Sequence, residues 1–182
     1  MKYHQRIFFV GVCNKPGKEP LDITTISGKM VSKMIAAFPN DEAMEYEWVR
    51  TNLFDEVLTI VNLKDFGGAP LAVRNWWRRN EVTEDDLIVS LGDIVNNAFR
   101  KAKVKSCKLG HPSRMWLNAD QKVTYLPRAI ERIGVALADH QSRDVETSER
   151  FLRAHGEDPE KLVTEGLKFI NDLISIQKNF LK

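Results

Sequence analysis

The sequence predicts an α/β protein built on a parallel sheet. Short apolar runs alternate with amphipathic segments of helical length, which is the pattern of consecutive strand–helix–strand units. The apolar runs are nearly continuous, as expected of strands that helices cover on both faces. A chain of 182 residues can bury one full hydrophobic core. We therefore expect one α/β domain over residues 1–140 and a helical C-terminal extension, residues 141–182, packed on the same domain.

Four strands are expected in chain order. Ile7–Val12 is an almost unbroken apolar run, which predicts the first central strand. Three further runs are interpreted as strands in the same way: Tyr46–Leu53, Leu87–Leu91 and Val104–Leu109.

Helices are expected between and after these strands. Ser27 is placed to cap the first helix, whose apolar residues recur at helical spacing until Pro39 and Asn40 end it. Further helices are predicted over three ranges: Leu71–Arg79, Asp93–Lys101 and Arg128–His140. The polar stretch Gln141–Ser148 is the expected linker, and Asp158 caps a last helix with Pro159 at its first position.

The composition limits the partners only loosely. A net charge of +2 permits an anionic partner without requiring one, because binding depends on where Lys and Arg gather. Cys13 and Cys107 are too few for an iron–sulfur cluster or a four-cysteine zinc site, and reduced thiols are expected. No apolar run approaches the roughly 20 residues of a membrane span. We expect a cytoplasmic monomer with no membrane or metal partner, associated with the nucleoid if its source is bacterial.

Polar groups follow the ends of the first and fourth strands. Phe8–Pro20 (FFVGVCNKPGKEP) runs from an apolar strand into a glycine and proline turn, and Leu109–Ser113 (LGHPS) does the same much later in the chain. The carboxyl ends of parallel strands meet at one edge of a sheet, where open α/β folds bind their ligands. The two turns are therefore expected to share one site.

Four short motifs, in this order, resemble the landmarks of the uracil-DNA glycosylase superfamily: Gly11–Gly17 (GVCNKPG), Arg50–Leu53 (RTNL), Val89–Gly92 (VSLG) and Gly110–Ser113 (GHPS). The resemblance covers about residues 5–138. It implies a three-layer α/β/α sandwich with a four-stranded parallel sheet. It also implies a hydrolase without metal or cofactor that removes uracil or a related modified base from DNA. The target base is flipped out of the helix or taken from a single strand.

The resemblance assigns the first motif to the attacking water. Asn14 would orient this water, and Gly11, Pro16 and Gly17 would form the turn against the substrate. Asn cannot take a proton, but an oxocarbenium-like sugar is so electrophilic that orientation of the water suffices. Asp22 is the nearest carboxylate and the fallback general base.

The resemblance assigns His111 and Asn52 to the departing base. A neutral imidazole can donate a hydrogen bond to the anion that develops on the pyrimidine, provided that burial keeps its pKa low. The amide of Asn52 offers a donor and an acceptor, which suits the imide edge of uracil. Ser113 is either a phosphate contact or a group hydrogen-bonded within its turn. Each assignment has a structural alternative. His111 would be a loop histidine, Asn14 a turn residue, and Asn52 or Ser113 a helix cap.

The first motif departs from the family pattern. Cys13 and Lys15 flank Asn14, so that the motif carries one extra residue. No aromatic residue for stacking on the base occurs in Leu21–Ile26. Base stacking must therefore come from elsewhere, and a non-catalytic nucleobase or nucleic-acid binding module on the same fold is the alternative to an enzyme.

Contacts to DNA are expected from cations near the two turns and from a wedge. Lys15, Lys18 and Arg114 are the candidate cations, with solvated surface charge as the alternative. The loop that enters the duplex in the family corresponds here to residues 114–117, where Met115, Trp116 and Leu117 are apolar enough to unstack a base step. A Trp116 packed on the protein surface is the alternative.

Two other segments have a functional interpretation. Ser27–Lys29 is similar to the end of a phosphate-binding P-loop, but Ile23 stands where the pattern needs a glycine and Met30 replaces the magnesium-binding hydroxyl residue. Arg74–Arg79 (RNWWRR) mixes cations with tryptophans, as nucleic-acid surfaces do. A helix with buried Trp and solvated Arg explains that segment equally well.

Overall fold

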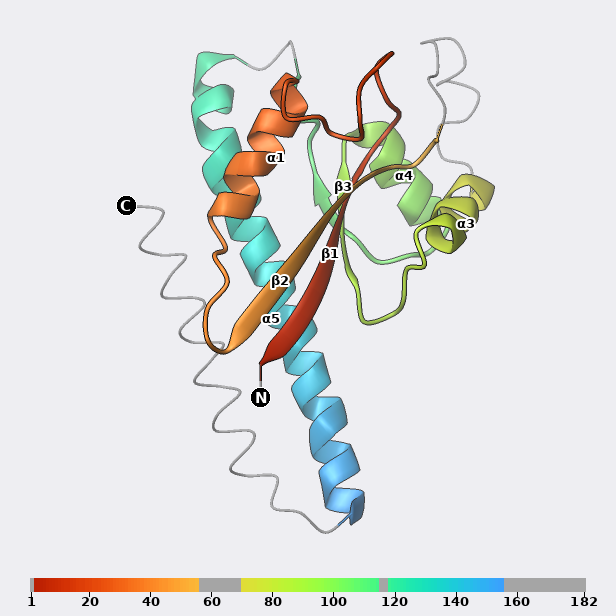
Figure 1. The fold of residues 1–182 in the computed structure, drawn as a ribbon, viewed down its shortest axis with the longest axis vertical. Coiled ribbons are helices and arrows are strands. Elements are labelled where there is room, and N and C mark those ends of the chain that lie inside the picture. The colour runs from red at the N-terminus through yellow and green to blue at the C-terminus, as the bar shows by residue number, and fades with distance from the viewer. Residues whose placement is uncertain (1, 56–69, 115–117, 156–182) are drawn as a thin grey trace. The chain divides into compact units, whose positions relative to one another are not determined.

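The structure, a computed structural model, describes residues 2–55, 70–114 and 118–155, with side chains as far as residue 143 (Figure 1). Strands and helices alternate along the chain in this order: β1 (Tyr3–Gly11), α1 (Ile26–Ala36), β2 (Met44–Asn52), α3 (Pro70–Arg79), β3 (Leu87–Leu91), α4 (Asp93–Lys101), β4 (Cys107–Leu109) and α5 (Ala119–His155). The four strands form one parallel sheet in the order β2-β1-β3-β4. The predicted α/β class and the four-stranded parallel sheet are confirmed.

Helices cover both faces of this sheet. Phe8 and Val10 of β1 project to the face where α3 and α4 pack, and they share a buried cluster with Trp76 and Phe99. Side chains alternate across a strand, so Phe9 projects to the opposite face, where it stacks on Trp48 with ring centroids 5.7 Å apart. Figure 1 shows α1 on one side of the strands and α3 with α4 on the other. Because helices cover both faces of the sheet, polar side chains for a site are expected where the strands end.

The cap of the first helix lies two residues earlier than predicted. The N-cap is Thr25, whose Oγ1 accepts a hydrogen bond from the Gly28 N–H at 3.0 Å, and Ser27 already lies inside the helix. Thr25 Oγ1 in turn donates to the carbonyl oxygen of Asp22 at 2.7 Å. A tertiary turn ahead of the helix thus selects the cap, which helical spacing alone could not identify.

The chain divides into two compact units, residues 1–126 and 127–182. The division falls at Pro127, inside helix α5. The stretch Gln141–Ser148, expected as a linker, is wrong as a prediction, because α5 runs through it without a break. The helix predicted to begin at Asp158 lies outside the described residues.

Within the described ranges, no helix is long and apolar enough to cross a membrane. The same part of the chain holds no group of three or more His, Cys, Asp or Glu side chains placed to bind one metal ion.

Candidate active site at the carboxyl edge of the sheet

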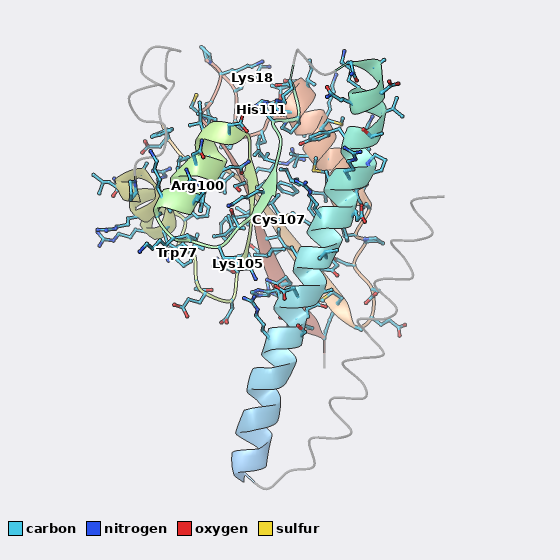
Figure 2. All side chains as sticks on the ribbon, turned by 180° about the vertical axis from the view of Figure 1, so that it is seen from behind. Lys18, Trp77, Arg100, Lys105, Cys107 and His111 are labelled. Carbon is cyan, nitrogen blue, oxygen red and sulfur yellow. The ribbon has the colours of Figure 1, made fainter. Side chains whose placement is uncertain are left out.

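The parallel strands bring the sequence motifs to one edge of the sheet. Strands β1 and β2 end in register, with Gly11 paired to Asn52, and β3 and β4 end in register, with Leu91 paired to Leu109. Asn14 lies three residues after the end of β1 and His111 two residues after the end of β4, so both lie at this carboxyl edge with Asn52. In Figure 2 the labelled side chains of Lys18 and His111 lie at the same end of the sheet.

Asn14 and Asn52 are in direct contact. The Asn52 Nδ2 donates a hydrogen bond to Asn14 Oδ1. With its amide turned over, Asn52 instead accepts from the Asn14 backbone N–H at 3.1 Å and donates to the Thr51 carbonyl oxygen at 3.1 Å. Asn52 is buried, with 6% of its surface exposed. In each orientation the Asn52 amide has a hydrogen-bond partner at Asn14, so the ends of β1 and β2 are joined through this side chain.

Gly11 makes room for this pair. A Cβ at Gly11 would lie 2.7 Å from Asn52 Oδ1, closer than carbon and oxygen approach without displacement. The first glycine of the motif therefore has a steric role in seating Asn52 at the end of β2.

The residues after Asn14 form a tight turn. The Lys18 N–H donates to the Lys15 carbonyl oxygen at 3.1 Å, and Gly17 has a φ of +68°. Proline in the second position and a left-handed glycine in the third are the features of a type II turn. Lys15, Pro16, Gly17 and Lys18 are exposed, and Lys18 Nζ donates to Thr24 Oγ1 at 2.9 Å. The motif, which is one residue longer than the family pattern, thus continues into an exposed turn over residues 15–18.

Asp22 has a structural task. Its carboxylate accepts from the Thr24 N–H at 2.7 Å and from Thr24 Oγ1 at 2.6 Å. These hydrogen bonds hold the pKa of Asp22 below its ordinary value. The backbone here is packed closely on α1, since a Cβ at Gly28 would lie 1.8 Å from the Asp22 carbonyl oxygen. The Oδ1 of this ionised carboxylate is thus held by Thr24 and organises the entry to α1.

His111 is half-buried and held in one tautomer by Ser113. The Ser113 N–H points to His111 Nδ1 at 3.2 Å, and the Ser113 Oγ lies 3.0 Å from the same atom. A backbone N–H can only donate, so Nδ1 accepts, and the neutral ring carries its hydrogen on Nε2. Burial lowers the pKa of His111, and the positive charges of Lys15 and Arg114 lower it further. The imidazole is therefore neutral at pH 7 and offers an Nε2–H donor.

Side chains from α4 and α5 hold the backbone just before His111. Asn96 Nδ2 donates to the Leu109 carbonyl oxygen at 2.9 Å, while its Oδ1 accepts from Ser90 Oγ at 2.7 Å. The hydroxyl of Tyr125 donates to the Gly110 carbonyl oxygen. Arg114 forms a salt bridge with Asp93, with its guanidinium 3.5 Å from the carboxylate. Asn96 and Tyr125 belong to no motif, so this role could not be predicted from local sequence.

Arg79 is a second positioning residue that the sequence did not reveal. Its guanidinium donates to the carbonyl oxygens of Asn52 and Leu53 at 3.1 Å and 3.3 Å, and it lies 3.5 Å from the Asp55 carboxylate. It thereby ties the end of α3 to the end of β2. A residue of the cation and tryptophan segment thus supports the candidate site through the backbone.

The structure brings some of the candidate residues together and separates others. The contact between Asn14 and Asn52 and the turn of His111 and Ser113 lie at one edge, whereas Asp22 is engaged in the helix entry. Met115, Trp116 and Leu117, expected in the wedge, lie outside the described residues. Comparisons of the chain with protein families, curated proteins and solved structures find no match.

Proposed function

We propose that the carboxyl edge of the sheet binds a flipped-out pyrimidine base and that the protein is a DNA N-glycosidase of the uracil-DNA glycosylase kind. The observation that carries the proposal is the contact of the Ser113 N–H with His111 Nδ1 at 3.2 Å. Nδ1 accepts from Ser113, which leaves Nε2–H as a neutral donor beside the cations Lys15 and Arg114. A donor of this kind stabilises the anion of a departing pyrimidine.

In the proposed reaction, the bond between the sugar C1′ and the base nitrogen breaks, and its electron pair goes to the base. The His111 Nε2–H then donates to the oxygen on which that charge collects. Asn14 orients a water, whose oxygen bonds to C1′ and whose proton is released to solvent. A neutral imidazole does not have to give up its proton, so the base leaves as an anion.

Base recognition is assigned to Asn52. Its buried amide lies beside the proposed water position, because it contacts Asn14. The amide offers one donor and one acceptor, which match the imide edge of uracil.

One observation favours the non-catalytic alternative. Asp22, the fallback base, has its Oδ1 held by two hydrogen bonds from Thr24, at the entry to α1. If orientation by Asn14 is insufficient, the same edge would bind a base without cleaving its bond.

The deciding experiment uses oligonucleotides that carry uracil, hypoxanthine, xanthine or hydroxymethyluracil at one position, single-stranded and in duplexes. Alkaline treatment cleaves at abasic sites and reports base release, and a thymine oligonucleotide is the control. Release from one or more modified substrates supports the enzyme. Tight, base-dependent binding without release identifies the binding module. The absence of both release and base-dependent binding rejects both functions.

A further inference from the structure

Helix α3 and the end of α4 line a pocket of about 420 Å³. The lining runs along one side of α3 and continues over residues 101–104, which end α4 and begin the connection to β4. Its size falls in the range of ligand pockets. Figure 2 shows Trp77, one of its lining residues, well away from His111, so the α3–α4 pocket is separate from the candidate active site.

The pocket is strongly cationic. Arg74, Arg78, Lys101 and Lys103 line it, and none of its lining residues is acidic. All four side chains are exposed, and no carboxylate in the described part of the chain forms an ion pair with them. Four positive charges around one hollow, with no acidic residue among its lining residues, create a positive potential that attracts polyanions.

Trp77 adds an aromatic surface to these charges. The neighbouring Trp76 is fully buried and donates from Nε1 to Thr51 Oγ1 at 3.0 Å, so it belongs to the core. Trp77 is only half-buried and packs edge-on against Trp76, with centroids 6.4 Å apart and planes at 75°. Its indole is thus backed by the core on one side and lines the pocket on the other. The segment Arg74–Arg79 therefore divides into core, positioning and surface residues.

We propose that the α3–α4 pocket binds single-stranded nucleic acid, with a base stacked on Trp77 and the flanking phosphates on the four cations. Stacking platforms combined with cationic grooves are how proteins hold single strands without reading their sequence, since every base has a π-face. Charge complementarity and the aromatic platform together favour this ligand over an acidic protein, because an acidic protein offers no base to stack on the indole. The proposal does not depend on glycosidase activity at the other edge.

The test is the affinity of the full chain for a fluorescently labelled dT oligonucleotide, measured by anisotropy over a series of salt concentrations. Arg74→Glu/Lys101→Glu should weaken binding by tenfold or more, and the slope of log affinity against log salt should fall by about 1.4, the value for two phosphate contacts on a single strand. Lys29→Glu/Lys33→Glu is the matched control, because it makes the same charge change at exposed residues of α1, on the other face of the sheet. An equal loss in both double variants would overturn the proposal.

The role of the indole is tested separately. Trp77→Ala should weaken dT binding by roughly 5- to 150-fold, the range for loss of one base–aromatic stack. Trp77→Phe keeps an aromatic platform and should recover most of the affinity, which distinguishes stacking from misfolding. If Trp77→Phe binds as weakly as Trp77→Ala while circular dichroism shows a native fold, or if poly-glutamate of equal charge competes as well as dT, the pocket is not a single-strand site. Base release plays no part in these measurements, so this inference and the proposed function fail independently.

Discussion

The backbone of Gly92 lies against the imidazole of His111. A Cβ at Gly92 would be 3.2 Å from the His111 Cβ and 3.3 Å from its Cδ2, tighter than ordinary van der Waals contact. Gly92 also has a φ of +88° and a ψ of 163°, a region that is essentially restricted to glycine. The residue between β3 and α4 therefore determines where the histidine after β4 can lie.

Gly92→Ala should consequently affect both stability and the histidine. We expect the free energy of unfolding to fall by about 1–3 kcal/mol from backbone strain, measured by urea denaturation. The NMR resonances of the His111 ring should shift as well. Gly17→Ala is the control, because Gly17 has a φ of +68° but no heavy atom within 4 Å of an added Cβ. His111 resonances that stay in place in Gly92→Ala would contradict the contact.

His111→Ala tests the proposed donor. Loss of one donor to a developing anion costs about 3 kcal/mol, so single-turnover base release should fall by on the order of a hundredfold. His4→Ala is a matched control, since His4 is exposed on β1 and pairs with Glu47 at 3.4 Å. A folded His111→Ala protein that releases base at the wild-type rate excludes the role.

The acid side of the pH profile follows from the lowered pKa of His111. The ordinary histidine pKa is about 6.5, and burial with the charges of Lys15 and Arg114 moves the folded value below it. If the neutral ring is the donor, base release is constant above pH 6.5 and declines only as the pH falls through that lower value. The same shift makes His111 protonation destabilise the fold, with the loss beginning below the unfolded pKa and increasing as the pH falls through the folded one.

Single-turnover rates and an NMR titration of His111 should give the same midpoint. His111→Gln keeps a hydrogen-bond donor that does not titrate, so its residual activity should lack the acid limb. An acid limb of equal midpoint in His111→Gln would assign the titration to another group.

Local patterns were sufficient for several elements. Strand β3 and helix α4 occur at the predicted residues, because an apolar run, a glycine and an amphipathic segment follow one another there. The parallel arrangement then follows from the alternation of strands and helices, and it brings Asn52 and His111 to one edge.

Long-range contacts set what the sequence could not predict. Thr25 replaces Ser27 as the helix cap because the Asp22 turn packs there. Helix α5 begins at Ala119 and passes through Pro127, whereas proline is usually found in the first turn of a helix. The contacts of Gly92 with His111 and of Arg79 with the end of β2 join residues from different elements, so no local spacing encodes them.

Asn52→Asp tests base discrimination. Uracil presents a carbonyl acceptor and an imino donor at the edge that the Asn52 amide is proposed to read, whereas cytosine presents an amino donor and a ring-nitrogen acceptor. A carboxylate repels the uracil carbonyl, but it accepts from the cytosine amino group and can share one proton with the ring nitrogen. The Asn14 N–H, which lies 3.1 Å from the Asn52 amide, can also hold a carboxylate in place. We therefore expect the variant to shift preference from uracil toward cytosine.

The size of the shift depends on the dry environment of Asn52. A buried polar group left unpaired costs about 1–3 kcal/mol, so the ratio of uracil to cytosine release should change by roughly 5- to 150-fold. The ratio is measured by single-turnover release from matched uracil and cytosine oligonucleotides, with wild type and variant in parallel. Asn97→Asp, on the exposed surface of α4, makes the same chemical change away from the site and should leave the ratio unchanged. If the ratio is the same in wild type and Asn52→Asp, Asn52 does not read the base, and its contact with Asn14 serves to hold the ends of β1 and β2 together.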